Sequence, residues 1–330
     1  MKPPGYFRHG GRLGEAAALF PQAPLPWIDL STGINPHGWA GPRADFAALQ
    51  RLPDTTETAA LEAAAAASFG VADPAMVAAI PGAESGLRLL PRLTGAPSVA
   101  ILSPTYGGHA EAWHAAGRDV RTATTLAALP DTAALVIVNP NNPDGKAIPA
   151  TSITQLVTPT RLLIVDESFV EIAPQSSVAA SASDRLIVLR SFGKFFGLAG
   201  VRLGFIIAGP GIIAQLRAAF GDWPVSAEAI AAGTAAYADP GWAQATRARL
   251  QQDSERLDRL LENAGLEILG GTCLFRLCTS PQAGNWFEHL ARNGLLVRPF
   301  SQQPNWLRFG LPGTDSAWSR LQAALQQGIS

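Results

Sequence analysis

The residue whose setting first suggests chemistry is a lysine among apolar neighbours. Lys194 lies in the stretch Arg190-Ser-Phe-Gly-Lys-Phe-Phe-Gly-Leu-Ala-Gly-Val-Arg-Leu-Gly-Phe205, in a chain of which only 15% is Asp, Glu, Lys or Arg. An amine among apolar groups loses the hydration that stabilises its charged form, which favours the uncharged, nucleophilic form. A solvated loop lysine would gain nothing from such neighbours, and we therefore expect Lys194 to take part in a reaction.

Lys194 is one of several polar residues that directly follow short apolar runs. Five segments do so in chain order: residues 81–86, 103–108, 139–145, 166–169 and 191–194. Ligands of open α/β sheets bind beyond the carboxyl ends of the strands, so these segments predict a ligand site at one edge of a sheet. The first of them opens a helix, whose backbone N–H groups are suited to a phosphate.

The apolar runs themselves predict the sheet. They cover residues 77–80, 99–102, 135–138, 162–165, 186–189 and 203–207. Several are β-branched and do not alternate with polar residues, as is typical of parallel strands covered on both faces. Most are separated by roughly 20 to 35 residues, which suits βαβ units. The pattern predicts an α/β domain with a mostly parallel central sheet flanked by helices.

Composition and helix patterns divide the chain into three parts. Residues 1–40 are rich in Gly and Pro and predict an irregular arm, and residues 55–69 predict a helix within a large domain that covers residues 41–222. Residues 223–330 predict a smaller α+β domain. Its expected elements are a long helical stretch over about 226–264, a strand-like segment over 266–278, a helix over 283–293, strands over 295–298 and 305–309, and a final helix over 314–327.

The composition excludes several functional classes. The net charge is −1 and the pI about 6.5, so no electrostatic attraction to nucleic acid or anionic lipid is expected. No apolar run is long enough for a membrane span or placed to act as an N-terminal signal. Cys273 and Cys278 are too few for a disulfide framework and wrongly spaced for zinc, and residues 271–278 alternate like a buried strand. We therefore expect a cytoplasmic protein without a metal site.

Taken together, the five polar segments resemble those of fold-type I enzymes, which use pyridoxal 5′-phosphate. The resemblance covers nearly the whole chain and is densest over residues 81–204. Its most specific part is Ser191-x-x-Lys194, followed eight residues after the lysine by Arg202. It implies a pyridoxal-phosphate cofactor, a mostly parallel sheet with a smaller α+β C-terminal domain, and an N-terminal arm packed on the active site and small domain. It also implies a homodimer, because this family builds each site at a subunit boundary.

The resemblance assigns a role to each polar segment. Lys194 would hold the cofactor covalently through its amine, and Asp166 would face the pyridine nitrogen and keep it protonated, so that the ring can accept electrons. These two are the expected catalytic residues. The other expected cofactor contacts are Tyr106 stacked on the ring, Asn142 on the ring hydroxyl, and Ala83, Glu84, Ser85, Ser191 and Arg202 on the phosphate.

Three further features resemble the threonine-phosphate decarboxylases within this family. They are the arm His9-Gly-Gly followed by Ile28-Asp-Leu-Ser-Thr-Gly-Ile-Asn-Pro36, the segment Trp223-Pro-Val-Ser226, and Phe169, where histidinol-phosphate aminotransferases usually carry Tyr. This resemblance implies decarboxylation of L-threonine O-3-phosphate to (R)-1-aminopropan-2-ol phosphate and CO2, a step of cobalamin biosynthesis. The residues expected to bind this small-molecule substrate are His9, Asn35, Arg298 and Arg308, with the division of carboxylate and phosphate between the arginines left open.

Two other functions stay open. A histidinol-phosphate-type aminotransferase would share nearly all cofactor residues, and Phe169 and the His9 arm argue against it. A non-catalytic ligand-sensing domain of the same fold is the second alternative, against which an intact Lys194 and Asp166 argue. The chain departs from the family at Leu52, where many relatives have a tyrosine that reaches the cofactor phosphate of the partner subunit. One phosphate contact is therefore expected to be missing.

Overall fold

The computed structural model describes residues 9–329, which form two compact units. The larger unit consists of Gly38–Asn142 and Lys146–Ala243, and the smaller one combines the chain up to His37, Pro143–Gly145 and the chain from Gln244 onward. The sequence instead predicted an arm over residues 1–40 and two domains over residues 41–222 and 223–330. That division stays a prediction. Residues 1–8 lie outside the described residues. They are part of the predicted arm, and the expectation that the N-terminus carries no signal also concerns them.

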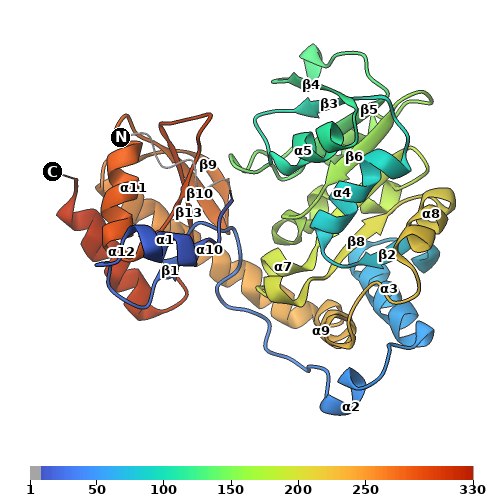
Figure 1. The fold of residues 1–330 in the computed structure, drawn as a ribbon, viewed down its shortest axis with the longest axis horizontal. Helices are drawn as coiled ribbons and strands as arrows, with labels where there is room; N and C mark the ends of the chain where they lie inside the picture. The colour runs from blue at the N-terminus through green and yellow to red at the C-terminus, as the bar shows by residue number, and fades with distance from the viewer. Residues whose placement is uncertain (1–8, 330) are drawn as a thin grey trace. The chain divides into compact units, whose positions relative to one another are not determined.

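A seven-stranded sheet forms the centre of the larger unit (Figure 1). Its strands, in spatial order, are β2 (Val77–Ile80), β8 (Gly204–Ile207), β7 (Leu186–Ser191), β6 (Leu162–Asp166), β5 (Ala134–Val138), β3 (Ser98–Leu102) and β4 (Asp119–Ala123). All six apolar runs predicted as strands are found in this sheet. Strand β4 was not predicted, because this edge strand is largely exposed and carries Asp119 and Arg121 instead of an apolar run.

The predicted mostly parallel sheet is confirmed, with one reversed strand. β8 runs antiparallel to both of its neighbours, β2 and β7, whereas the other strand pairs of the sheet are parallel. Gly204, at the start of β8, therefore pairs with Ile80 at the end of β2 and with Ser191 at the end of β7. The reversal brings the loop before β8, with Arg202, to the sheet edge at which the parallel strands end.

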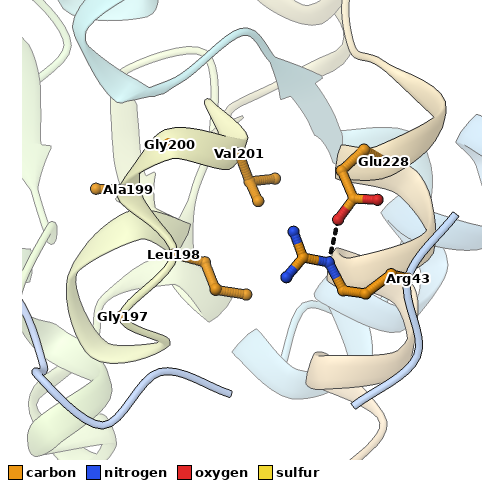
Figure 2. Close-up of a pocket in the computed structure, with 7 residues that line it drawn as sticks. All are labelled: Arg43, Gly197, Leu198, Ala199, Gly200, Val201 and Glu228. Atoms are coloured by element: carbon orange, nitrogen blue, oxygen red, sulfur yellow. Dashed lines mark hydrogen bonds and ion pairs between the residues drawn. The ribbon is translucent and has the colours of Figure 1, made fainter. Parts of the chain in front are cut away.

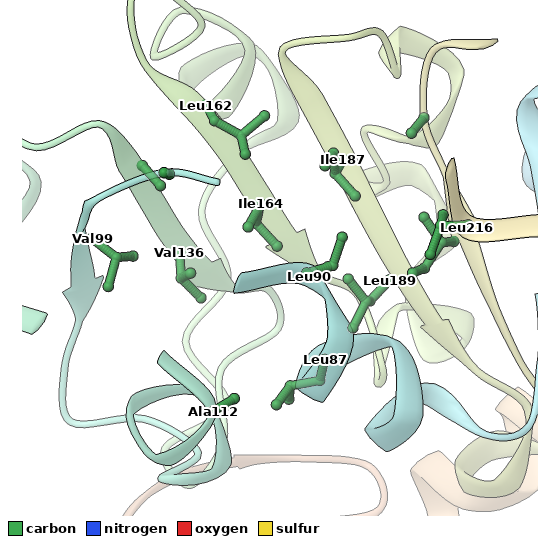
Figure 3. Packing of buried hydrophobic residues seen from close by; sticks show 14 of the residues in the cluster. Leu87, Leu90, Val99, Ala112, Val136, Leu162, Ile164, Ile187, Leu189 and Leu216 are labelled. Atoms are coloured by element: carbon green, nitrogen blue, oxygen red, sulfur yellow. The ribbon is translucent and has the colours of Figure 1, made fainter. Parts of the chain in front are cut away.

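Apolar helix faces cover the sheet and form the main core of the larger unit. In α4 (Ala83–Leu93), Leu87 and Leu90 are spaced three residues apart on one helix face. They belong to one buried cluster with Val136, Ile164 and Leu189 of the central strands (Figure 3). Helices α5 (Gly108–Ala115) and α8 (Pro210–Phe220) contribute to the same cluster. Burial of these side chains stabilises the unit and thereby holds the strand ends in place.

Two sequence predictions concern the remaining α-helices of the larger unit. These helices are α2 (Phe46–Leu49), α3 (Thr55–Phe69), α6 (Ala150–Thr154), α7 (Phe192–Phe195) and α9 (Ala227–Tyr237). The helix predicted over residues 55–69 is confirmed as α3. The long helical stretch predicted over about residues 226–264 is found, but it is interrupted, because the chain forms α9 and then α10 (Pro240–Asn263). Proline has no N–H group to continue a helix but suits a first turn, and the Asp239 side chain accepts from the backbone N–H of Trp242 at 3.0 Å.

The smaller unit is built on a four-stranded antiparallel sheet. Its strands, in spatial order, are β12 (Arg298–Pro299), β13 (Trp306–Gly310), β10 (Phe275–Thr279) and β9 (Glu267–Thr272). Its other elements are the parallel pair of β1 (Ile28–Asp29) with β11 (Leu295–Leu296), helices α1 (Leu13–Leu19), α11 (Ala283–Arg292) and α12 (Asp315–Gln327), and α10 from Gln244 onward. The strand-like segment predicted over residues 266–278 is a hairpin with Cys273 and Leu274 in its turn, and the strand predicted over 295–298 is divided between β11 and β12.

Neither a membrane-spanning helix nor a metal-binding group of His, Cys, Asp or Glu is found among the described residues. Over residues 9–329, no helix combines the length and apolar character needed to cross a membrane. The described side chains also include no group of three or more His, Cys, Asp or Glu that could hold a metal ion. Cys273 and Cys278 are both free thiols.

Ile164 of β6 tests whether the buried cluster carries the stability of the larger unit. Its side chain is 1% exposed, and Ile164→Ala leaves a cavity, so we expect the free energy of unfolding to fall by about 2–5 kcal/mol. Leu25→Ala is the control, because Leu25 is 76% exposed and its truncation is expected to cost less than about 0.5 kcal/mol. Urea denaturation followed by circular dichroism measures both variants, and equal losses would contradict the prediction.

Candidate active site

Lys194 is held in place by a cluster of aromatic side chains. It lies in α7, the short helix that follows β7. Phe196 is stacked on Trp242 with ring centroids 5.5 Å apart, and it meets Tyr237 edge-on at 5.0 Å. Phe192 stacks on Phe196 at 4.7 Å. The apolar neighbours of the lysine therefore anchor α7 to α9 and to the first turn of α10, which leaves the Lys194 backbone little freedom.

The amine of Lys194 lies over the ring of Phe169. The Nζ atom is 5.8 Å from the ring centroid, and Phe169 itself is 3% exposed. Phe169 comes three residues after β6, and Lys194 comes three residues after β7, so the parallel pairing of these two strands brings the side chains together. Phe169 offers the amine an aromatic face, with no hydroxyl group of its own.

Asp166, the last residue of β6, is a buried carboxylate that accepts several hydrogen bonds. Its Oδ2 lies 2.9 Å from Nε2 of His109, and its Oδ1 accepts from the backbone N–H of Ser168 at 2.9 Å and from the Ser168 hydroxyl at 2.5 Å. Burial acts to raise the pKa of Asp166, but His109 and Ser168 lower it by more, so this pKa lies below its ordinary value of 3.8. Asp166 is therefore ionised at neutral pH and suited to pair with a cationic ring nitrogen.

His109 is a site residue that the sequence analysis missed. It lies in the first turn of α5, three residues after Tyr106, and is 2% exposed. Its signal in the sequence was weak, because it comes just after the polar segment 103–108 and has no charged residue beside it. Only the order of strands β3, β5 and β6 in the sheet brings the start of α5 to the end of β6, where Asp166 lies.

The start of α4 and the loop before β8 form a cradle that fits an anion. Gly82 has a φ of 82°, and a Cβ atom there would lie 2.6 Å from Nη2 of Arg202, so the guanidinium lies directly against bare backbone. A Cβ atom at Gly204 would lie 2.4 Å from the backbone nitrogen of Ala83, and the Ser85 hydroxyl donates to the Gly82 carbonyl at 2.8 Å. The first N–H groups of a helix favour an anion, and arginine binds phosphate through two nitrogens. The cradle therefore fits the phosphate of a cofactor.

The other predicted cofactor residues lie on neighbouring strand ends of the same unit. Tyr106 follows β3 and is half-buried, and its hydroxyl donates to Oε2 of Glu84 at 3.2 Å. Asn142 follows β5, Ser191 ends β7, and both are partly exposed. The Glu84 side chain is not suited to bind the cofactor phosphate, because its carboxylate would repel that anion. At this position only the backbone N–H is suited to that group.

A second group of predicted residues lies in the smaller unit. Arg298 of β12 and Arg308 of β13 are directly opposite in the antiparallel register, which places them on one face of the sheet. Arg308 is 7% exposed, and its Nη2 donates to the carbonyl of Ser31 at 2.8 Å. Burial and the charge of Arg298 lower the pKa of Arg308 to about 9, against the opposing effect of Asp29. Two cations held in register favour a bound anion, which would offset their repulsion.

The N-terminal arm packs against Ser31, the residue whose carbonyl accepts a hydrogen bond from Arg308. The backbone N–H of Gly11 donates to the Ser31 hydroxyl at 2.8 Å, and a Cβ atom at Gly10 would lie 2.4 Å from the Ser31 carbonyl oxygen. That carbonyl is the one that accepts from Arg308. The structure therefore brings the segment that begins at His9 next to the surroundings of Arg308, although the two are far apart in the sequence.

Asn35, the remaining predicted substrate residue, is 1% exposed. Its side-chain oxygen accepts from the backbone N–H of His37 at 2.9 Å. This contact shapes the turn at residues 35–37, near the point where the chain leaves the smaller unit.

A cavity of about 280 Å³ lies beside the segment that links Lys194 to Arg202. Its lining residues are Arg43, Gly197, Leu198, Ala199, Gly200, Val201 and Glu228 (Figure 2). Arg43 and Glu228 form an ion pair in this lining. Neither Lys194 nor Asp166 lines the cavity, so it is separate from the residues assigned to the cofactor.

Comparisons with known proteins agree on the kind of protein. The family model for aminotransferase class I and II matches residues 26–324. A threonine-phosphate decarboxylase of Pseudomonas aeruginosa is 39% identical over 96% of both chains, and one of Sinorhizobium sp is 40% identical over 96% of this chain and 97% of that one. The crystal structure of the histidinol-phosphate aminotransferase of Clostridium acetobutylicum matches with a TM-score of 0.78 at 18% identity, and covers 90% of this chain and 98% of that chain. This last similarity shows the fold alone.

His109→Ala tests the contact that keeps Asp166 ionised. Without His109, only the hydrogen bonds from Ser168 oppose the effect of burial, so the pKa of Asp166 rises and the ionised carboxylate contributes less stability to the folded protein at neutral pH. We expect the free energy of unfolding at pH 7 to fall by about 3 kcal/mol, the order of magnitude for breaking a buried pair. The loss should shrink as the pH falls toward about 4, because the variant's Asp166 becomes protonated.

Thermal and urea unfolding of the cofactor-free protein between pH 7 and pH 4 measure this effect. His114→Ala is the matched control, because His114 is an exposed histidine of the same helix. A loss at His109 that does not depend on pH would show that His109 acts through packing and leaves the charge of Asp166 unaffected.

Proposed function

This chain belongs to the aminotransferase class I and II family, and from that premise we propose that it decarboxylates L-threonine O-3-phosphate to (R)-1-aminopropan-2-ol phosphate and CO2. Pyridoxal 5′-phosphate is the cofactor, and when bound it accepts the electron pair that the departing carboxyl group leaves behind. The observation that carries the choice of reaction is the similarity to two threonine-phosphate decarboxylases over nearly the whole chain.

The residues of the larger unit suit this cofactor in three respects. The cradle of Gly82 and Arg202 offers backbone N–H groups and a guanidinium to its phosphate. Asp166 offers an ionised, buried acceptor to the ring nitrogen, and His109 keeps that carboxylate oriented. Lys194 offers an amine on a rigid, short helix. We assign covalent attachment of the cofactor to Lys194, with Tyr106, Asn142 and Ser191 as further contacts.

Phe169 supports decarboxylation over amino-group transfer. Its ring lies under the Lys194 amine, at the position where histidinol-phosphate aminotransferases usually have a tyrosine hydroxyl that donates to the cofactor ring. Phe169 is buried and has no such donor. We infer that the Lys194 amine would donate the proton that replaces the carboxyl group at Cα.

The arginines of the smaller unit suit a substrate with two anionic groups. Arg298 and Arg308 are held in register, and the His9 arm packs on the residue that accepts from Arg308. Holding both the phosphate and the carboxylate of a substrate restricts its orientation, and that orientation decides which bond to Cα breaks. We propose that these residues, with Asn35, bind the substrate.

We also propose that the enzyme is a homodimer of the cytoplasm that acts in cobalamin biosynthesis. Phe46, Leu49 and Leu52 are 74%, 57% and 63% exposed, and a second copy would remove such apolar side chains from water. The free thiols of Cys273 and Cys278 suit a reducing compartment. The place in cobalamin biosynthesis follows from the sequence resemblance to enzymes that make aminopropanol phosphate.

Product analysis tests the proposed reaction. We expect the protein loaded with pyridoxal phosphate to release equal amounts of CO2 and aminopropanol phosphate from L-threonine O-3-phosphate, with no keto acid present. Lys194→Ala should lower the rate by about a thousandfold or more, because it removes both the attachment point and the proton donor. Lys146→Ala is the control, since Lys146 is an exposed lysine and should leave the rate unchanged.

Two outcomes would contradict the proposed reaction. Absence of CO2, together with amino transfer from histidinol phosphate to 2-oxoglutarate, would identify an aminotransferase. Turnover of neither substrate by a protein that takes up no pyridoxal phosphate would favour the non-catalytic sensing domain.

The lowered pKa of Arg308 predicts how substrate binding depends on pH. A guanidinium binds an anion in its charged form, which is lost as the pH rises through about 9. We therefore expect the affinity for L-threonine O-3-phosphate to fall about tenfold per pH unit above that value. Arg298→Gln removes the neighbouring charge and should move this fall to higher pH, whatever its effect on affinity at pH 7.

Calorimetric titration of the Lys194→Ala protein between pH 7 and pH 10 measures the affinity without turnover. Arg292→Gln is the matched control, because it removes an exposed arginine of the same unit and should leave the pH profile unchanged. An affinity that stays constant through pH 10 would contradict the assignment to Arg308.

A further inference from the structure

The ring of Tyr106 is oriented by contacts on several sides. It packs on the backbone of Gly108, where a Cβ atom would lie 2.4 Å from Cε1 of the ring. It meets the His109 ring edge-on, with centroids 6.3 Å apart and an interplanar angle of 86°. Its hydroxyl donates to Oε2 of Glu84 at 3.2 Å. The first two contacts come from the start of α5 and the third from α4, so the hydrogen bond to Glu84 ties the tyrosine to a second helix.

The Glu84 carboxylate is itself held by a fixed partner. Its Oε1 accepts from Nε of Arg88 at 2.7 Å, and Arg88 donates through Nη2 to Glu111 at 3.2 Å. Glu84 and Arg88 are one turn apart in α4, and Glu111 lies on α5. This chain of contacts joins the two helices and gives the carboxylate a defined position from which to accept the tyrosine hydroxyl.

The charges explain why a carboxylate is tolerated beside an anion cradle. Glu84 comes directly after Ala83, at the helix start where the cofactor phosphate is assigned, so its negative charge would repel that phosphate. Pairing with Arg88 offsets the charge. Burial and the charge of Glu84 raise the pKa of Tyr106 above its ordinary value of 10, so the hydroxyl stays protonated and donates to Glu84 throughout the neutral range.

We propose that Glu84 is a positioning residue for the cofactor site: it holds the Tyr106 ring in one orientation through the hydroxyl. The proposal rests on the cofactor site described above. It differs from the sequence expectation, in which Glu84 was grouped with the phosphate contacts, because its side chain serves the tyrosine and only its backbone faces the cradle.

A double-mutant cycle between Glu84 and Tyr106 tests this role with cofactor binding as the readout. The full-length Glu84→Ala, Tyr106→Phe and doubly substituted proteins are titrated with pyridoxal phosphate, and the circular dichroism of the bound cofactor is recorded in its visible band. We expect Glu84→Ala to weaken cofactor binding by about fivefold and to reduce the visible signal. In the Tyr106→Phe protein the same substitution should have no further effect, because the hydroxyl is absent.

Two further variants separate the hydrogen bond from the charge. Glu84→Gln keeps an oxygen that accepts from Tyr106 and should restore most of the affinity and of the dichroic signal. Glu57→Ala is the matched control, because it removes a carboxylate that is paired with an arginine in the first turn of α3, and it should leave cofactor binding unchanged.

An equal loss of affinity from Glu84→Ala with and without the Tyr106 hydroxyl would overturn the proposal and assign Glu84 to the charge balance of the helix start. A wild-type protein that binds no pyridoxal phosphate would overturn both this inference and the proposed function. A wild-type protein that binds the cofactor and shows the coupling, yet releases no CO2, would refute only the proposed reaction.

Discussion

The larger unit depends on a buried negative charge at the end of a central strand. Removing a carboxylate from water costs free energy unless donors replace the water, and at Asp166 the donors are His109 and Ser168. The net effect is a pKa below the ordinary value despite nearly complete burial. The sheet therefore ends in an acceptor that is already ionised and oriented, so binding a cationic ring nitrogen requires no rearrangement of this residue.

The reversed strand β8 determines where the cradle for the phosphate is formed. Had β8 been parallel to its neighbours, the loop that carries Arg202 would lie at the opposite edge of the sheet. Its antiparallel pairing brings that loop to Gly82, and the absence of side chains at Gly82 and Gly204 lets the guanidinium and the start of α4 approach closely. Strand direction and two glycines together create the cradle, and neither would suffice alone.

The smaller unit collects positive charge by a different device. Arg298 and Arg308 repel each other across two antiparallel strands, and the burial of Arg308 makes the repulsion costly, as its lowered pKa shows. The carbonyl of Ser31 and the charge of Asp29 offset part of this cost. Residues that are costly to stability in the absence of a ligand are commonly retained for binding, which is why this pair supports the proposed anionic substrate.

The sequence by itself determined the properties that are local in the chain. The apolar runs, the polar residues that follow them and the spacing of Lys194 and Arg202 predicted a mostly parallel α/β sheet and the family. Only the tertiary structure decided the direction of β8, the exposed edge strand β4 and the contacts of His109 with Asp166 and of Glu84 with Tyr106. These contacts join residues 57 and 22 positions apart, and they depend on strand order and side-chain direction, which no local pattern encodes.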